Sequence, residues 1–415
     1  MLIHWIWLAT RPHMNDRDKL AVLTHFGTPE DIFFADSTAY TQIPDMTQQI
    51  FDSLQDKDLN MAGDILRECV DLGIHICTFN DGAYPSRLKN IADPPMVLYY
   101  VGHLPDLDGT PVISAVGTRK ASAYGLNVAK RIGGQLARCG AIVVTGMAAG
   151  IDAAAASGVL TAGGTVVGVL GCGVDIVYPA CNRGLFADVE RHGCLISEFA
   201  PGTEPFKWNF PKRNRIMSGL ANGVLIVEAP KTSGALITAQ QAADQGRDVF
   251  VVPGNVDVPN CVGSNALMRE GAIPVSNGWD VVSEYLALYP DKIRRDRSSI
   301  QPVGFMGDMA VEEKPEPKVA QKVKKVGNSQ TIDENAEKIA VDNKQNQTYY
   351  DIHKTFESLT ESQRRIAQLL LDGEQLVDDV IAKAEMPAGE VLSQLTLMEI
   401  QGIVVRKPGK RVALK

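Results

Sequence analysis

Short apolar runs recur along the middle of the chain, and most are followed by a helical pattern. Residues 112–116, 141–145 and 165–170 are runs of mainly β-branched side chains that end in glycine and small polar residues. Amphipathic helices are predicted after them at 125–139, 151–162 and 183–192. Alternation of this kind indicates a mostly parallel α/β sheet covered on both faces. Shorter strands are predicted at 194–198, 224–228, 249–252 and 272–275.

The first 75 residues have a helical pattern without strands. Helices are predicted at 16–26 and 31–35, with Thr28 as an N-cap and Pro29 in the first turn. The pattern from Leu23 through Gly27 to Ile32 is that of a helix-hairpin-helix, which presents backbone amides to DNA phosphates. The alternative is a small SAM-like helical domain that only packs. The apolar opening lacks a basic region, so it is interpreted as a packed helix rather than a signal peptide.

A junction rich in proline leads into the sheet. Residues 74–79 and 97–101 are strand candidates, and Pro85, Pro94 and Pro95 lie between them. Each proline disfavours helix at the residue before it, so this segment is expected to run extended. We place the main domain at 76–288, after a helical domain at 1–75.

The composition changes after residue 288. Residues 289–350 are rich in Lys, Glu, Asn and Gln, and a segment that buries so little apolar surface is predicted to be a disordered linker. Its basic run at 318–325 is either a solvated part of the linker or a DNA contact.

The tail at 351–415 predicts a winged-helix domain: helices at 360–371, 375–384 and 387–401, then a hairpin at 403–414 with a basic tip. In such domains the third helix can enter a DNA groove. Here that helix carries Glu390 and Glu399 and no Lys or Arg. DNA contact and a protein-interaction or packing role both remain open for it.

The charge and the motifs of the chain argue against several classes of function. The net charge of -8 argues against indiscriminate polyanion binding, although residues 112–285 carry 14 Lys and Arg against 13 Asp and Glu. The seven cysteines show no zinc spacing, and neither a Walker A motif nor a complete dinucleotide fingerprint is present. No run reaches the roughly 18 apolar residues of a membrane helix. We expect a cytoplasmic protein without metal, cofactor or membrane contact.

Three turns after predicted strands have the composition of anion cradles. Gly117, Thr118 and Arg119 follow the first strand, Gly146 and Gly150 the second, and Ser233 and Gly234 open a helix that carries Thr238. Backbone amides at a helix N-terminus favour an anion, and the carboxyl ends of parallel strands meet at one edge of a sheet. The three turns are therefore predicted to line one crevice.

A cationic run lies between two of the strands. Residues 209–220 contain Lys212, Arg213, Asn214 and Arg215, which are predicted to form one group beside the crevice. Arg183 and Lys207 are added on charge alone. The residues point to a phosphate-bearing ligand.

Catalysis has little support in the sequence. His192 is the only histidine between residues 112 and 285 and is interpreted as a helix cap. Asp152, Glu198 and Glu228 are interpreted as braces for the arginines or as helix caps. No catalytic residue is predicted.

Together these motifs resemble the DprA/Smf family. Upstream, Tyr84 with Pro85 and residues 93–95 match its pattern as well. The likeness is strong over residues 74–280 and loose in the flanking domains. The matching residues are 117–119, 146–152, 178–179 with Asn182, 197–198, 210–215, 227–229, 233–236, 238–239, 246–247 and 252–254.

The resemblance implies a Rossmann-like domain that binds and protects single-stranded DNA and loads the RecA recombinase onto it in natural transformation (competence) and DNA recombination, usually as a homodimer. It implies DNA contact by Arg119, Arg213 and Arg215. The turn at 146–150 and the pair Ser233 and Gly234 are implied in the same way. It does not place the RecA or dimer surface on particular residues.

Three aromatic residues, Phe206, Trp208 and Phe210, either offer a face to a base or belong to the core. Two other functions remain open. A phosphoribohydrolase-related enzyme would carry a glycine pair and a glutamate that residues 231–239 lack, and would release free base from nucleoside monophosphates. A nucleotide sensor would prefer a mononucleotide to an oligomer.

Overall fold

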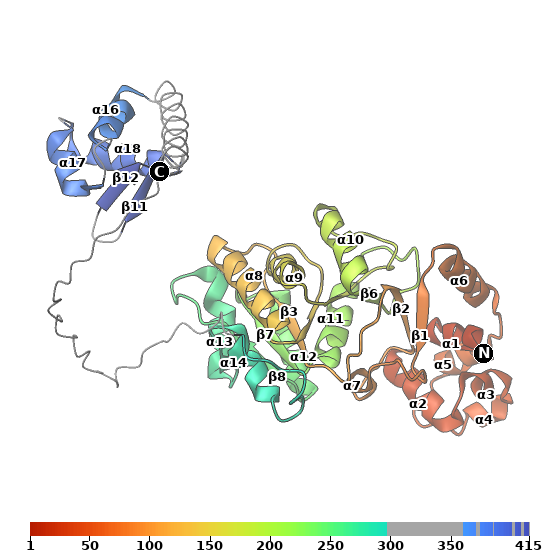
Figure 1. The fold of residues 1–415 in the computed structure, drawn as a ribbon. Coiled ribbons are helices and arrows are strands. Elements are labelled where there is room, and N and C mark those ends of the chain that lie inside the picture. The colour runs from red at the N-terminus through yellow and green to blue at the C-terminus, as the bar shows by residue number, and fades with distance from the viewer. Residues whose placement is uncertain (297–359, 371–373, 385, 401–402, 408–410, 415) are drawn as a thin grey trace, which may run out of the picture. The chain divides into compact units, whose positions relative to one another are not determined.

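The computed structural model describes residues 1–296, 360–370, 374–384, 386–400, 403–407 and 411–414. The chain divides into two compact units, Met1–Met309 and Ala310–Lys415, which are described separately (Figure 1). The first residues of the predicted linker, 289–296, are ordered instead, because Ile293 is buried and Asp296 forms an ion pair with Arg138. The rest of the predicted linker, from position 297 on, lies outside the described residues, and so does the whole basic run at 318–325. No helix among the described residues is both long and apolar enough to cross a membrane.

A nine-stranded sheet forms the centre of the first unit, in the order β1-β2-β6-β5-β4-β3-β7-β8-β9. From β6 to β9 neighbouring strands are parallel, whereas β2 is antiparallel to both β1 and β6. This confirms the predicted doubly wound, mostly parallel sheet. The strands are β1 (His75–Thr78), β2 (Val97–Gly102), β3 (Val112–Val116), β4 (Ile142–Thr145), β5 (Val166–Val169), β6 (Cys194–Ser197), β7 (Gly223–Ile226), β8 (Asp248–Val251) and β9 (Ile273–Pro274).

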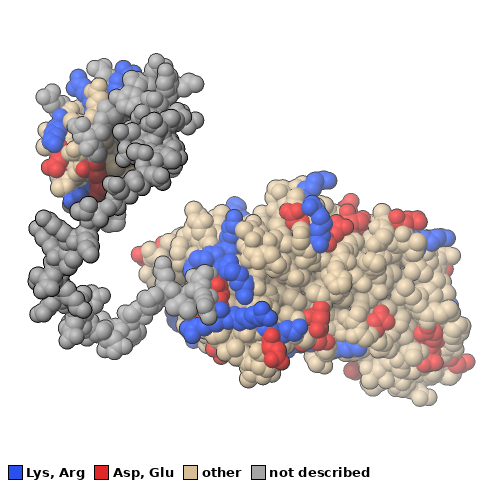
Figure 2. All heavy atoms as spheres, viewed as in Figure 1, with Lys and Arg blue, Asp and Glu red and all other residues tan. Residues whose placement is uncertain are grey.

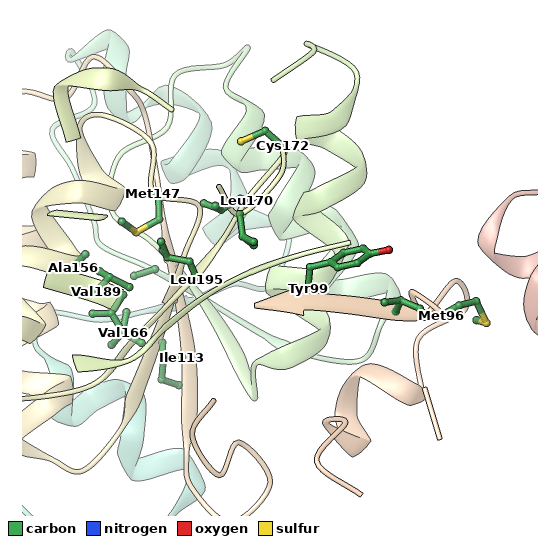
Figure 3. Close-up of a cluster of buried hydrophobic side chains, with 14 of the residues drawn as sticks. Met96, Tyr99, Ile113, Met147, Ala156, Val166, Leu170, Cys172, Val189 and Leu195 are labelled. Carbon is green, nitrogen blue, oxygen red and sulfur yellow. The ribbon is translucent and has the colours of Figure 1, made fainter. Parts of the chain in front are cut away.

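Helices cover both faces of this sheet, because side chains of the buried strands point alternately to either side. One face packs on α8 (Ala123–Arg138), α9 (Ile151–Thr161), α10 (Arg183–His192) and α14 (Gly278–Val282). The other packs on α7 (Ser86–Lys89), α11 (Asn209–Leu220), α12 (Gly234–Asp244) and α13 (Val262–Arg269). Figure 3 shows part of the first core, where Ile113, Val166 and Leu195 of the strands lie with Ala156 and Val189 of the helices.

Six helices precede the sheet, and their core is continuous with that of its first face. Thr28 caps α3 by accepting a hydrogen bond from the Asp31 amide at 3.1 Å, as predicted, although the helix begins at Pro29. Leu23 and Ile32 are both buried in this core. The helices are α1 (Leu2–Ala9), α2 (Asp16–Phe26), α3 (Pro29–Phe34), α4 (Ser37–Tyr40), α5 (Gln48–Gln55) and α6 (Asn60–Asp71).

The described residues of the second unit form three helices and a three-stranded sheet in the order β10-β12-β11, the predicted winged-helix arrangement. Its elements are α16 (Glu361–Leu369), β10 (Gln375–Leu376), α17 (Val377–Lys383), α18 (Ala388–Ile400), β11 (Val404–Lys407) and β12 (Arg411–Leu414). The second helix was predicted from residue 375, but the first two residues of that range pair with β12 instead. Lys407 and Arg411 both form ion pairs with Glu374, and the hairpin tip at 408–410 lies outside the described residues.

Candidate functional site

A cavity of about 310 Å³ opens where β3 and β7 end. Its walls are the turn at 116–119 after β3, the turn after β4, the start of α11, and residues 230–238 after β7. The chain runs outward from β3 through β4, β5 and β6, then returns to the other side of β3 as β7. The cavity therefore lies where the strand order reverses, the usual ligand site of open α/β sheets.

The turn after β3 is held in place from two sides. Glu228, which is buried at the end of β7, accepts a hydrogen bond from the Ser122 amide at 2.9 Å and another from the Ser122 hydroxyl. On the other side Gly150 has a φ of 84°, and a Cβ there would lie 2.4 Å from the carbonyl oxygen of Thr118. Only glycine fits so close to this turn, which carries Arg119.

The N-terminus of α12 opens onto the same cavity. Ser233 caps this helix by accepting a hydrogen bond from the Ala235 amide at 3.2 Å. No atom lies within 4 Å of a Cβ placed on Gly234, so a ligand has room to approach the backbone there. Thr238 lies at the start of the second turn and also lines the cavity. A helix N-terminus with free space before it favours an anion through its amides and its dipole.

Arg213 joins this cavity to a smaller one of about 190 Å³. Its guanidinium is almost fully buried, and it donates hydrogen bonds to the carbonyl oxygens of Gly146, at 2.8 Å, and Val169. Burial lowers the pKa of Arg213 to about 10, although Asp152 opposes the shift. The side chain therefore remains a cation at neutral pH.

Asp152 lies in the first turn of α9 and lines the larger cavity. Its carboxylate accepts a hydrogen bond from the Gly146 amide at 3.0 Å. Burial raises the pKa of Asp152 to about 6, against the attraction of Arg213. Asp152 thus fixes the turn at Gly146, whose carbonyl oxygen in turn accepts a hydrogen bond from Arg213.

Arg119 lines the smaller cavity together with two aromatic rings, Tyr178 and Phe210. The Arg119 guanidinium lies 5.1 Å from the centre of the Phe210 ring, and Tyr178 lies 5.6 Å from that ring on another side. Arg119 has no ion pair within the described residues. Phe206 and Trp208 lie just before α11 and are stacked at 4.7 Å with 7° between their planes, and Trp208 is 70% exposed. The Phe210 ring beside the Arg119 guanidinium suits a ligand that has both bases and phosphates.

The prediction that Lys212, Arg213 and Arg215 form one group is wrong, because residues 209–220 form the helix α11. Residues that are two positions apart on a helix with 3.6 residues per turn point to nearly opposite sides of it. Arg215 therefore points away from the cavity, where its Nη2 atom lies 2.6 Å from Asp16 and 2.7 Å from Glu198.

Asp93 lies 3.2 Å from Nε of Arg215, and Lys212 lies 3.6 Å from Asp16 and 3.8 Å from Glu198. Within α2, Lys19 also forms an ion pair with Asp16, at 3.4 Å. Asp16 belongs to α2, so the network links the N-terminal helices to the sheet. Glu198 is a brace for an arginine, as predicted. We call Asp16, Asp93, Glu198, Lys212 and Arg215 the α11 ion-pair network.

The other predicted site residues lie at different distances from the cavity. Asn214 lines the larger cavity and Gly146 the smaller. Arg183 begins α10, and Lys207 precedes α11; both are exposed and line neither cavity. Phe210 and Tyr178 line the smaller cavity although no ligand contact was assigned to Tyr178. The sequence could have indicated Tyr178 as a site residue, because it lies in the loop after the predicted strand at 165–170 and precedes a proline.

Comparisons with known proteins bear on the family of the chain. A family model described as "DNA recombination-mediator protein A" matches residues 75–286, and one described as "DprA winged helix domain" matches 355–410. DNA processing protein DprA of Bacillus subtilis is 40% identical over 212 residues, 51% of this chain and 71% of that protein. Protein Smf of Synechocystis is 32% identical over 337 residues, 80% of this chain and 78% of that protein.

Among solved structures, the X-ray structure of DNA processing protein A from Streptococcus pneumoniae matches with a TM-score of 0.61 and 31% identity. The match covers 68% of this chain and 98% of that one.

Proposed function

The chain belongs to the DNA recombination-mediator protein A (DprA/Smf) family, and from this premise we propose that it binds single-stranded DNA in the cavity at β3 and β7 without chemical turnover. Arg119 and the amides of the β3 turn and of α12 would neutralise phosphates. Arg213 is a fixed cation beneath them. The observation that carries the proposal is that Arg119, which has no ion pair within the described residues, lines the same cavity as the N-terminus of α12 and lies 5.1 Å from the Phe210 ring.

Aromatic stacking would add affinity without sequence preference. A base stacked on an aromatic side chain contributes roughly 1 to 3 kcal/mol. Phe210 lies beside both arginines, at 5.1 Å from Arg119 and 6.0 Å from Arg213, so a base on its ring would place the adjoining phosphates near two cations. Phe206 and Trp208 would extend this platform outward.

The wider role that we propose follows from family membership: protecting the bound strand and loading the RecA recombinase onto it during natural transformation and recombination, as a homodimer. Two modest sites in a dimer would engage one strand, which raises avidity through effective concentration. No residue of this chain is assigned to the RecA or dimer surface.

Polarisation of a labelled oligothymidine at two salt concentrations tests the cavity. Arg119→Ala is expected to weaken binding and to reduce the dependence of log affinity on log salt by about 0.7, the contribution of one phosphate contact on a single strand. The control is Arg67→Ala, which removes an exposed arginine of α6. Unchanged affinity and salt dependence for Arg119→Ala would overturn the assignment, and release of free base from nucleoside monophosphates would contradict binding without turnover.

A further inference from the structure

A second group of cations lies on the first unit, around the C-terminal half of α8. It consists of Lys130, Arg131 and Arg138 of α8 with Lys292, Arg294 and Arg295, and all six side chains are exposed. We call these six residues the α8 basic face. In Figure 2 blue side chains gather over the part of the first unit in which Figure 1 shows α8 and α14.

This face is built by specific contacts rather than by loose side chains. The Arg294 amide donates a hydrogen bond to the carbonyl oxygen of Cys139 at 3.0 Å, which holds residues 292–296 against the end of α8. Nη2 of Arg131 donates to the carbonyl oxygen of Ser276 at 3.2 Å. The Arg295 guanidinium lies 5.4 Å from the centre of the Trp279 ring in α14. Three segments of the chain thus present their cations together.

The positive charge of this face is largely uncompensated. α8 contains no acidic residue. Arg138 forms an ion pair with Asp296 at 2.8 Å, whereas the other five cations have none within the described residues. Nearby, Asp280 accepts hydrogen bonds from Ser276 and Asn277, and Asp291 is exposed. Because the whole chain carries a net charge of -8, such a concentration of cations is not a general property of its surface.

α8 connects the basic face to the cavity. The helix begins directly after the turn that carries Arg119, and its 16 residues span about 24 Å at 1.5 Å per residue. Lys120, Tyr124, Asn127 and Arg131 are exposed at spacings of three or four residues, so the last three lie along one side of the helix. A strand that leaves the cavity over Lys120 can follow this line.

We propose that the α8 basic face binds phosphates of the same single strand, beyond the nucleotides held in the cavity. This inference rests on the proposed function. At the 3.4 Å spacing of a stacked strand, about 7 nucleotides cover the length of α8. The cavity binds a short oligomer alone, and the basic face contributes only when the oligomer is long enough to reach it.

The test compares a 5-nucleotide and a 20-nucleotide oligothymidine with the full chain. The triple variant Lys130→Gln, Arg131→Gln and Arg294→Gln keeps Arg138 and Arg295, which have an ion pair and a ring contact. We expect at least a tenfold loss of affinity for the long oligomer and a salt dependence reduced by about 2, because each phosphate contact contributes about 0.7. Affinity for the short oligomer is expected to stay unchanged.

A control with the same loss of charge is Arg17→Gln, Arg67→Gln and Arg191→Gln, at exposed positions elsewhere on the first unit. It should leave affinity for the long oligomer within about twofold of wild type if position matters more than net charge. Urea unfolding midpoints equal to wild type would show that both triple variants are folded. If the short oligomer binds too weakly to titrate, the salt dependence for the long one decides.

Three results would overturn the proposal: an α8 triple variant that binds the long oligomer with unchanged affinity and salt dependence, equal losses in the control, or a loss confined to duplex DNA. Arg119→Ala distinguishes failure of this proposal from failure of the proposed function, because the variant should weaken the binding of both the short and the long oligomer. If Arg119→Ala has no effect while the α8 variant loses affinity for the long oligomer, the cavity assignment fails and with it the placement of the basic face beyond the cavity, although the face itself still binds single-stranded DNA.

Discussion

Replacement of Arg215 by methionine tests the α11 ion-pair network. The guanidinium is buried against Asp16 at 2.6 Å and Glu198 at 2.7 Å, both of which are buried as well. Removing one partner of a buried ion pair leaves an uncompensated charge, which costs about 3 to 5 kcal/mol. We therefore expect Arg215→Met to lower the free energy of unfolding by about that amount at pH 8.

The loss should become smaller in acid. Burial acts to raise the pKa of Asp16, but Lys19, Lys212 and Arg215 outweigh it, so that this pKa is lowered in the wild type. Burial raises the pKa of Glu198 despite the attraction of Arg215. Without the arginine both pKa values move upward in the folded state, and that of Glu198 moves further above its unfolded value. A group of this kind costs stability above its folded pKa, and the cost disappears as the pH falls and the group is protonated.

Urea denaturation followed by tryptophan fluorescence at pH 8 and pH 5 measures both effects, since Trp5 and Trp7 report on the N-terminal helices. The matched control is Lys212→Met. Lys212 approaches the same two carboxylates at 3.6 and 3.8 Å, but its side chain is 47% exposed, so its loss should cost about 0 to 1 kcal/mol. Equal effects of the two variants, or a cost of Arg215→Met that grows in acid, would refute the reasoning.

Two further perturbations address the turns of the cavity. Gly150→Ala should destabilise by more than the roughly 1 to 2 kcal/mol of a positive φ and should also weaken DNA binding, because its Cβ would lie 2.4 Å from the carbonyl oxygen of Thr118. Gly163→Ala, with a φ of 74° and open space, should show the backbone cost alone; equal urea midpoints and DNA affinities for the two would contradict this. Asp152→Asn concerns a carboxyl whose pKa burial raises to about 6, above its unfolded value, so its charge costs stability above pH 6. Wild type should gain about 1 kcal/mol relative to this variant between pH 7.5 and pH 5, measured by urea denaturation, and a gain of the variant instead would show that the assigned shift has the wrong sign.

The sequence was sufficient to predict the sheet, because its strands are continuous β-branched runs that end in glycine. β3 and β5 illustrate this: both are buried throughout, and no polar alternation obscures their limits. The common location of the three glycine turns was predicted from the same reasoning, because parallel strands end at the same edge of a sheet. The winged helix was also predictable apart from β10, which is too short to show the alternation of buried and exposed residues that indicates a strand.

The role of Arg215 could not be predicted in this way. Its partner Asp16 is 199 residues away in the chain, and no local pattern announces a pair at that separation. Grouping Arg213 with Arg215 also assumed that neighbours in sequence share a direction. A helix separates them, and the composition of residues 209–220, with Pro211, Gly219 and two asparagines, is not that of a strong helix former.

The two-sided character of α11 also matters for any attempt to shorten the protein. A truncated version that starts at residue 75, where the family model begins, would retain Arg215, Glu198 and Asp93 but would lack Asp16. Such a version would also expose sheet-facing apolar side chains that α1 now covers. Minimal versions intended for crystallisation or DNA-binding work should therefore keep α1 and α2, even though neither lines the cavity.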